Sequence, residues 1–496
     1  MRSALPLAAL ATLTLAAQGA QAAPKWLRLS WTDDPSTTLT ATWTDLAGTG
    51  SAEIRVPGSE ATGIGAAVEA TGISDLAYTY SATFTALLPD TAYEYRVYST
   101  GTWSAWHQTR TAPALGSCAH VSLAAVGDSR GEELPLVGTY VPSSQWAAIA
   151  AMIAAEQPLF VVHSGDVVRA GGRGDEWAAE LAILEPLAAG LPTFVALGNH
   201  DIGPGEGAGA YFNRVLAFPA DNPDGVEDYY GLVVGNVQLL VLSTETFDMD
   251  AQITWLAGQL AAHGSDVVWR VVVFHRAVWS SGVHGSNEND ATRAAVLLPI
   301  LESAGVDVVI NGHDHDYERF HPSTGGAGTP RVVTPLASDN GTRGTAEGVV
   351  YFVSGGGGAL VYPAPLTPIE GSARLEQHLN YLVLDAAGGT LRIIVRDLGE
   401  QGAGPPGSVS DLEVVTLEKP GIACSTPGDD GGGDGGPDGG AVGADPGRSE
   451  LDGGDVDIGY GAPPIRGCGC HEGMGSPAVV LALAALLLRR NAARRT

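Results

Sequence analysis

The chain has 496 residues, enough for about two or three domains with cores of their own. Its 26 Lys and Arg residues against 55 Asp and Glu residues give a formal net charge of −29. Charge will therefore not draw the chain to nucleic-acid backbones or to anionic lipid, which excludes nucleic acid as an electrostatically recruited partner.

Residues 1–22 have the pattern of a secretory signal peptide. Arg2 supplies the positive start, residues 4–17 are largely apolar, and Ala20-Gln21-Ala22 forms a small-x-small cleavage site. A buried N-terminal helix is the alternative reading. The pattern predicts a secreted protein, in an environment where disulfides persist.

The chain contains four cysteines, at positions 118, 424, 468 and 470. A bridge between Cys118 and Cys424 would tie together the two ends of the region between them. Four cysteines allow three pairings, so spacing alone does not establish this bridge, and two separate thiols stay open as the alternative.

Residues 25–113 alternate apolar and polar side chains and are rich in Thr, Trp, Tyr and Val. Short strands are expected near 27–31, 39–43, 78–82 and 93–97, with turn signals between them. This pattern predicts an all-β domain, a sandwich of the fibronectin-III or immunoglobulin type.

Residues 118–424 alternate strands with helices, which is typical of a layered α/β (α+β) core. Helices are predicted at 146–155, 176–187, 250–263 and 291–304, and the last part returns to strands at 349–354, 379–384, 391–395 and 412–417.

The C-terminal part divides into a linker and a tail. Residues 425–466 are dominated by Gly, Asp and Pro and are predicted to be a disordered linker. Residues 467–496 hold two cysteines, an apolar run and closing arginines. The run has about a dozen apolar residues, fewer than the roughly 20 that span a bilayer.

This tail resembles the cysteine-bearing C-terminal sorting tails of the myxobacterial type. The resemblance implies cleavage near the cysteines and anchoring at the cell surface, with membrane contact only through the tail. A plain hydrophobic anchor and a metal site at Cys468 and Cys470 are the alternatives, although zinc usually requires more ligands.

Five short polar clusters each follow a predicted buried strand in the α/β region. Because the ends of successive strands meet at one edge of a sheet, these side chains are expected to converge. Carboxylate oxygens and imidazole nitrogens there would suit a pair of divalent or trivalent metal ions such as Fe, Zn or Mn. The clusters are Gly127-Asp128-Ser129-Arg130, Gly165-Asp166, Gly198-Asn199-His200-Asp201, His275 and Gly312-His313-Asp314-His315.

The order of these clusters resembles that of the calcineurin-like metallophosphoesterases, and the chain is most similar to the purple acid phosphatases. Further similarity lies at residues 229–231, 252–256 and 351–357. The resemblance implies a four-layer metallophosphoesterase β-sandwich flanked by helices, preceded by a fibronectin-III-like domain.

The resemblance also implies roles for individual residues. Asp166 would bridge two metals, and His200 would contact the phosphate or protonate the leaving oxygen. His284 lies where the family has a substrate-facing histidine, although it is also readable as a surface-loop residue. The remaining metal ligands would be Asp128 and His315 at the first site, and Asn199, His275 and His313 at the second.

Two arginines depart from the family pattern. Arg169 stands where purple acid phosphatases have the tyrosine that binds ferric iron, and Arg130 stands where many metallophosphoesterases have a ligating histidine. Arginine has no acceptor atom and cannot bind a metal, so a colourless enzyme with a more open first site is predicted. Each arginine would either grip substrate phosphate or pair with Asp175, Glu176 or Asp201.

The resulting hypothesis is a secreted, dinuclear, acid phosphatase-like hydrolase. Its phosphate-ester substrates would be phosphomonoesters, which it would hydrolyse by attack of a metal-activated hydroxide. A phosphodiesterase or nucleotidase of the same fold is the nearest alternative. A non-catalytic cell-surface binding protein is the second.

Overall fold

The computed structural model describes residues 24–73, 76–133, 138–202, 211–245, 249–285, 291–325, 330–337, 343–344, 347–363, 365–402 and 405–422. All of them belong to the compact unit Met1–Gly431. The predicted signal peptide, linker and sorting tail lie outside the described residues. Among the residues described, no helix is long and apolar enough to cross a membrane.

Cys118 is disulfide-bonded. The other three cysteines of the chain lie outside the described residues, so the pairing with Cys424 stays a prediction.

The N-terminal domain is built from two antiparallel sheets, which confirms the predicted β-rich domain. Trp43 and Tyr80, which face each other on neighbouring strands of the first of these sheets, stack with ring centroids 5.4 Å apart. One sheet has the order β1 (Lys25–Ser30), β2 (Leu39–Asp45), β6 (Tyr78–Phe84), β5 (Ala67–Ala70). The other has the order β4 (Thr62–Gly65), β3 (Ser51–Arg55), β7 (Ala92–Ser99), β8 (Thr102–Trp103), with β9 (His107–Arg110) paired to β7.

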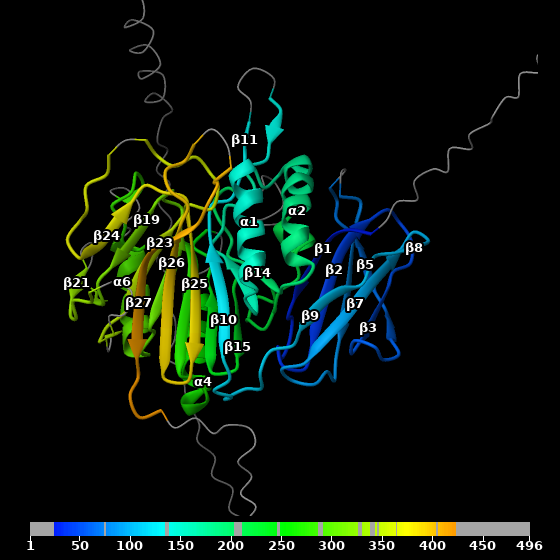
Figure 1. Cartoon of the computed structure of the whole chain (residues 1–496), viewed down its shortest axis with the longest axis horizontal. Coiled ribbons are helices and arrows are strands. Elements are labelled where there is room, and N and C mark those ends of the chain that lie inside the picture. The colour runs from blue at the N-terminus through cyan, green and yellow to red at the C-terminus, as the bar shows by residue number, and fades with distance from the viewer. Residues whose placement is uncertain are drawn as a thin grey trace, which may run out of the picture. The chain divides into compact units, whose positions relative to one another are not determined.

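Two seven-stranded sheets form the larger part of the structure (Figure 1). The first runs β14 (Thr193–Val195), β13 (Phe160–His163), β10 (Val121–Val126), β25 (Asn380–Ala387), β26 (Thr390–Asp397), β27 (Ser410–Glu418), β22 (Arg343–Gly344). The second runs β15 (Tyr230–Val234), β16 (Val237–Val241), β17 (Trp269–Arg276), β18 (Val308–Gly312), β23 (Val350–Ser354), β19 (Tyr317–Phe320), β24 (Ser372–Glu376).

All four predicted helices are present, with ends within about two residues of the predicted ones. They are α1 (Ser144–Glu156), α2 (Gly174–Ala188), α4 (Met249–Ala262) and α6 (Ala291–Ser303). Shorter elements are α3 (Phe212–Val215), η1 (Gly264–Asp266), and the strand pairs β11 (Glu132–Glu133) with β12 (Tyr140–Val141) and β20 (Ser323–Thr324) with β21 (Arg331–Val332).

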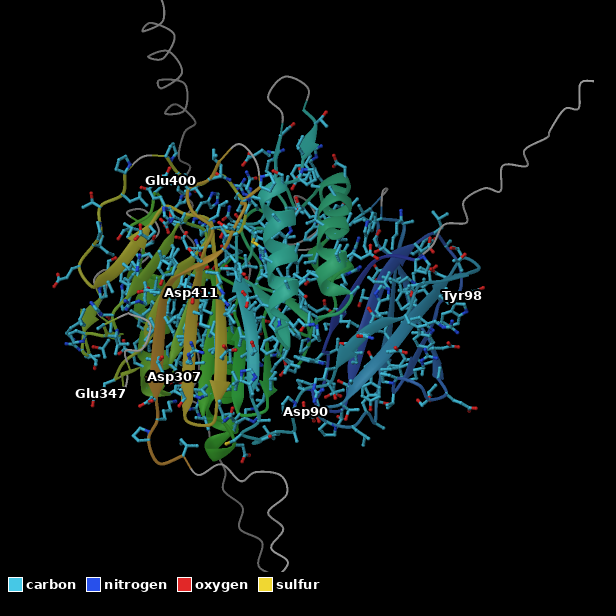
Figure 2. The ribbon with its side chains drawn as sticks, viewed as in Figure 1. Asp90, Tyr98, Asp307, Glu347, Glu400 and Asp411 are labelled. Carbon is cyan, nitrogen blue, oxygen red and sulfur yellow. The ribbon has the colours of Figure 1, made fainter. Side chains whose placement is uncertain are left out.

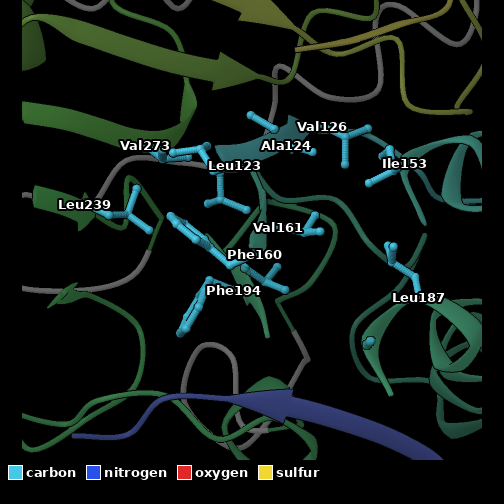
Figure 3. Close-up of a cluster of buried hydrophobic side chains, with 14 of the residues drawn as sticks. Leu123, Ala124, Val126, Ile153, Phe160, Val161, Leu187, Phe194, Leu239 and Val273 are labelled. Carbon is cyan, nitrogen blue, oxygen red and sulfur yellow. The ribbon is translucent and has the colours of Figure 1, made fainter. Parts of the chain in front are cut away.

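Side-chain alternation in the second sheet separates two hydrophobic cores. Leu239 and Val273 belong to the core shared with the first sheet and with α1 and α2. Their chain neighbours Leu240 and Val272 belong to the other core, with residues of α4 and α6. Figure 3 shows Leu239 and Val273 near Leu123 and Phe160 of the first sheet. The predicted arrangement of two stacked sheets between helices is confirmed.

Parallel pairing brings the predicted clusters to one edge. β10 pairs in parallel with β13 and β13 with β14, while β17 and β18 pair in parallel in the second sheet. One detail of the prediction is wrong, because His275 lies inside β17 rather than after it. The strand continues to Arg276, whose residue pairing with Gly312 of β18 follows a bulge.

The N-terminal domain packs directly on the α/β part. Arg28 Nε donates to the Val215 carbonyl oxygen at 2.5 Å, and the Tyr95 hydroxyl donates to the Ala189 carbonyl oxygen at 2.8 Å. Lys419, which directly follows β27, pairs with Asp307 at 2.7 Å, and Figure 2 labels Asp307 beside that strand.

Candidate metal centre

Three predicted ligands sit in an unusual backbone conformation. Asp128, Asp166 and His313 have φ angles of 59°, 60° and 73°, in the left-handed region that side-chain-bearing residues rarely adopt. Such conformations cost about 1–3 kcal/mol each and persist only where the surroundings enforce them, typically at functional sites. The loops at this edge are therefore held in place by the rest of the fold.

Close backbone packing explains two glycines of the clusters. A Cβ added to Gly198 would lie 2.3 Å from the Asp166 amide nitrogen, and one added to Gly312 would lie 2.3 Å from Asp128 Oδ2. Neither position has room for a side chain, so the ligand-bearing loops can approach each other only through glycine.

The second ligand group consists of Asp166, His275 and His313, all buried, with ligand atoms within 4.8 Å of one another. His275 Nε2 lies 3.3 Å from Asp166 Oδ1 and 3.2 Å from His313 Nδ1. The side-chain oxygen of Asn199 lies 3.1 Å from His275 Nε2. The structure thus brings together all four side chains predicted for this site.

The first ligand group consists of Asp128, Asp166 and His315, again buried and within 4.8 Å. His315 Nε2 lies 3.5 Å from Asp128 Oδ1. That oxygen is buried and has no hydrogen-bond partner among the described residues. A buried carboxylate oxygen without a donor is costly, and a cation between it and the imidazole would remove that cost.

Two of the predicted ligand histidines have one ring nitrogen within hydrogen-bond distance of a backbone carbonyl oxygen. His275 Nδ1 lies 2.9 Å from the Ser164 oxygen, and His315 Nδ1 lies 2.7 Å from the Leu360 oxygen. Donation from Nδ1 leaves Nε2 free as a lone-pair donor, which is the arrangement that supports metal-ligating histidines. The residues present therefore fit two borderline metal ions, with Asp166 common to both groups.

Asp166 and His275 strongly affect each other's pKa. Burial acts to raise the pKa of Asp166, but the attraction of His275 outweighs it and holds the pKa below its usual range. Burial acts to lower the pKa of His275, and Asp166 raises it to about 10. The aspartate is thereby kept ionised in the metal-free fold, and a metal that binds His275 Nε2 would displace the proton there.

Asp201 organises the loops that carry the ligands. Its carboxylate accepts backbone N–H groups of Asp166, Val167, Val168 and Gly198 at 2.9, 2.9, 3.1 and 3.0 Å. One buried side chain therefore fastens the loop of Asp166 to the loop of Asn199 and His200.

His200 lies beside Asp166 with its side chain about one-third exposed. Its Nδ1 is 2.6 Å from the Arg169 carbonyl oxygen, and its Nε2 is 4.0 Å from Asp166 Oδ2. Burial is the main cause of a lowered pKa for this imidazole. His284 also reaches the edge, since its ring centroid lies 4.3 Å from that of His313.

The two arginines differ in their surroundings. Arg130 Nε lies 3.7 Å from Asp166 Oδ2 and has no hydrogen-bond partner among the described residues, while its Nη1 donates to Glu132 at 3.1 Å. Arg169 forms a short ion pair with Glu133 and a longer one of 3.5 Å with Glu176. Pairing with Glu176 was one of the two alternatives predicted for Arg169. Of the two arginines, Arg130 is the better placed to contact a substrate, because its Nε has no hydrogen-bond partner within the described residues.

Sequence reasoning gave no functional role to Asp201, Tyr362 or the carbonyls of Ser164 and Leu360. Asp201 was visible in the Gly-Asn-His-Asp cluster, but only as a partner for an arginine. Tyr362, whose ring stacks on that of the ligand His315, lies in an irregular segment with no motif around it, so the sequence carried no signal for it.

Comparison with known proteins agrees with this geometry. Residues 121–317 match the calcineurin-like phosphoesterase family, and residues 24–111 match the purple acid phosphatase N-terminal domain. The chain carries a calcineurin-like metallophosphoesterase domain preceded by a purple acid phosphatase N-terminal domain.

Relatives and solved structures extend the match. An uncharacterized protein of Mycobacterium tuberculosis is 28% identical over 316 residues, covering 57% of this chain and 59% of that protein. "Probable inactive purple acid phosphatase 1" of Arabidopsis thaliana is 26% identical, covering 60% of this chain and 51% of that protein. The aligned part is thus little more than half of these relatives.

The purple acid phosphatase PPD1 of yellow lupin, Lupinus luteus, has a similar fold, with a TM-score of 0.65 and 20% identity over 80% of this chain and 74% of that chain. The structure of PhoD gives a TM-score of 0.58 at 14% identity, covering 80% of this chain and 90% of that chain. These two likenesses establish the shared fold of the phosphoesterase domain.

Proposed function

We propose that the chain is a dinuclear metal-dependent phosphatase that hydrolyses phosphomonoesters. The observation that carries this proposal is the pair of buried ligand groups that share Asp166. When bound, two such metals would lower the pKa of a coordinated water and neutralise charge on the phosphoryl oxygens.

The side chains of the chain would bind and orient the ester. Arg130, whose Nε lies 3.7 Å from Asp166 Oδ2 and has no hydrogen-bond partner within the described part of the chain, would donate to a phosphoryl oxygen as a planar, permanently charged group. His200, partly exposed beside Asp166, would face the leaving oxygen and donate a proton to it from Nε2 when the imidazole is protonated, a form that the lowered pKa confines to acidic solution. No covalent phosphoenzyme is required by this arrangement.

The proposal is tested with purified protein, metal analysis and two substrates. We expect about two metal ions per chain and hydrolysis of p-nitrophenyl phosphate that a chelator abolishes and that Zn, Mn or Fe restores. Faster hydrolysis of bis(p-nitrophenyl) phosphate would favour a phosphodiesterase. Fewer than two metals and no hydrolysis after metal addition would favour a binding protein.

The expected colour of the enzyme depends on Arg169. Because arginine stands where a tyrosine would bind ferric iron, we propose a colourless enzyme. An intense visible band in the purified, iron-loaded protein would contradict this.

Export and surface anchoring through the C-terminal tail are part of the same proposal, and fractionation of cells expressing the full chain tests them.

A further inference from the structure

Tyr362 is held rigidly over the first ligand group by its own segment. The Ala359 amide donates to the Asp128 carbonyl oxygen at 2.8 Å, and the Leu360 carbonyl accepts from His315. The Val361 amide donates to Gln401 at 2.8 Å. The Tyr362 ring stacks on the His315 ring with centroids 4.8 Å apart and planes 6° apart. The phenol therefore has one fixed orientation relative to the metal ligands.

His284 is fixed from two sides. Its amide donates to Asp314 Oδ1 at 2.9 Å, and its Nε2 lies 3.0 Å from the Tyr362 hydroxyl. Gly282 lies so close to Asp314 that an added Cβ would be 2.1 Å from the carboxyl carbon, which leaves this turn no room to shift. Within the described residues, His284 Nδ1 has no hydrogen-bond partner.

We infer that Tyr362 is a positioning residue that donates to His284 Nε2 and so leaves Nδ1–H of His284 directed to a substrate phosphoryl oxygen. A hydrogen bond at one ring nitrogen decides which nitrogen carries the proton, and the phenol is a good donor. His284 then donates to the phosphate from Nδ1, and Tyr362 acts only through His284. This inference rests on the proposed phosphatase function.

The test is a double-mutant cycle on the full chain. Tyr362→Phe, His284→Ala and the double variant are assayed with p-nitrophenyl phosphate, and inorganic phosphate binding is measured by calorimetry. We expect Tyr362→Phe to raise KM and the phosphate dissociation constant about fivefold, the size of one hydrogen bond, with kcat changed by less than about twofold. The double variant should match His284→Ala, because one residue acts through the other.

Tyr381→Phe is the matched control, because this buried tyrosine donates to Glu156 at 3.1 Å and belongs to neither ligand group. It should leave KM and phosphate binding unchanged. Multiplying effects in the double variant, or an unchanged Tyr362→Phe, would overturn the inference. Loss of a metal ion from Tyr362→Phe would also overturn it, by assigning the phenol to His315.

If the wild-type chain hydrolyses no phosphomonoester, the proposed function fails on its own. The phosphate-binding cycle then still decides the role of Tyr362, because binding requires no turnover. Equal phosphate affinity of wild type and Tyr362→Phe would reject that role.

Discussion

The two ligand groups share Asp166 but differ in what surrounds them. The second group gathers Asn199, His275 and His313 around that carboxylate. The first has only Asp128 and His315 besides Asp166, and Arg130 approaches Asp166 from the same side. Each group has an arginine nearby, since Arg276 Nη1 lies 3.2 Å from His313 Nε2 of the second group, but Arg276 is also paired with Glu245 at 2.6 Å. The first group has one ligand fewer, so we expect it to bind its metal more weakly than the second.

The largest effect is expected where the two groups meet. Asp166→Asn removes the carboxylate common to both, so we expect loss of both metals and a fall in kcat of well over about a hundredfold. Metal analysis and p-nitrophenyl phosphate kinetics measure this. Retention of one tightly bound metal would show that the second group does not depend on Asp166.

Removing one histidine from each group compares them directly. His315→Ala should abolish the first site and leave about one metal per chain, held by the second group. His313→Ala should weaken the second site and leave less than one metal, because the first group binds more weakly alone. Equal metal content in the two variants would contradict the predicted difference in affinity.

Replacing Arg130, the arginine beside the first group, should reduce the difference in metal affinity between the two sites. Arg130→His removes the opposing charge and adds a nitrogen ligand, so metal affinity at the first site should rise at least about tenfold. Arg173→His is the matched control, because Arg173 pairs with Asp175 at 2.6 Å and lies outside both groups. Calorimetric titration of metal into the metal-free protein distinguishes the two variants.

The smallest effect is expected on the pH dependence of stability, through a buried hydrogen bond between β12 and α2. Tyr140 of β12 donates a short hydrogen bond to Glu180, whose burial raises its pKa from 4.5 to about 8. Between these values the folded protein holds a proton that the unfolded chain has released, so stability falls as pH rises from about 4.5 to about 8.

In Glu180→Gln the side chain is neutral at every pH, so the loss of stability between about pH 4.5 and pH 8 should be smaller than in the wild type. The check is the difference in Tm between pH 5 and pH 8, expected to shrink by several degrees in the variant. Glu60→Gln, at an exposed position between β3 and β4, serves as the control and should keep the wild-type difference in Tm. An unchanged difference in Glu180→Gln would mean that Glu180 is ionised in the fold.

The sequence predicted much of this site because its signals were local. A glycine and a ligand after a buried strand are readable from the chain, and parallel strands bring their ends to one edge. The partners of Arg169 were only partly readable, since Glu133 reaches it from β11, which precedes it by more than 30 residues. Tyr362 was not readable at all, because irregular backbone positions it through long-range hydrogen bonds.

The left-handed backbone at Asp128, Asp166 and His313 has a consequence for how such a site tolerates substitution. Glycine would relieve the backbone strain at each position. At Asp128 and Asp166 it would also remove the carboxylate oxygens that accept the amides of His313 and His200 at 2.9 Å. The carboxylates that can hold a metal therefore also fasten the neighbouring ligand loops, so the loss of either one would loosen the loops even in the metal-free protein.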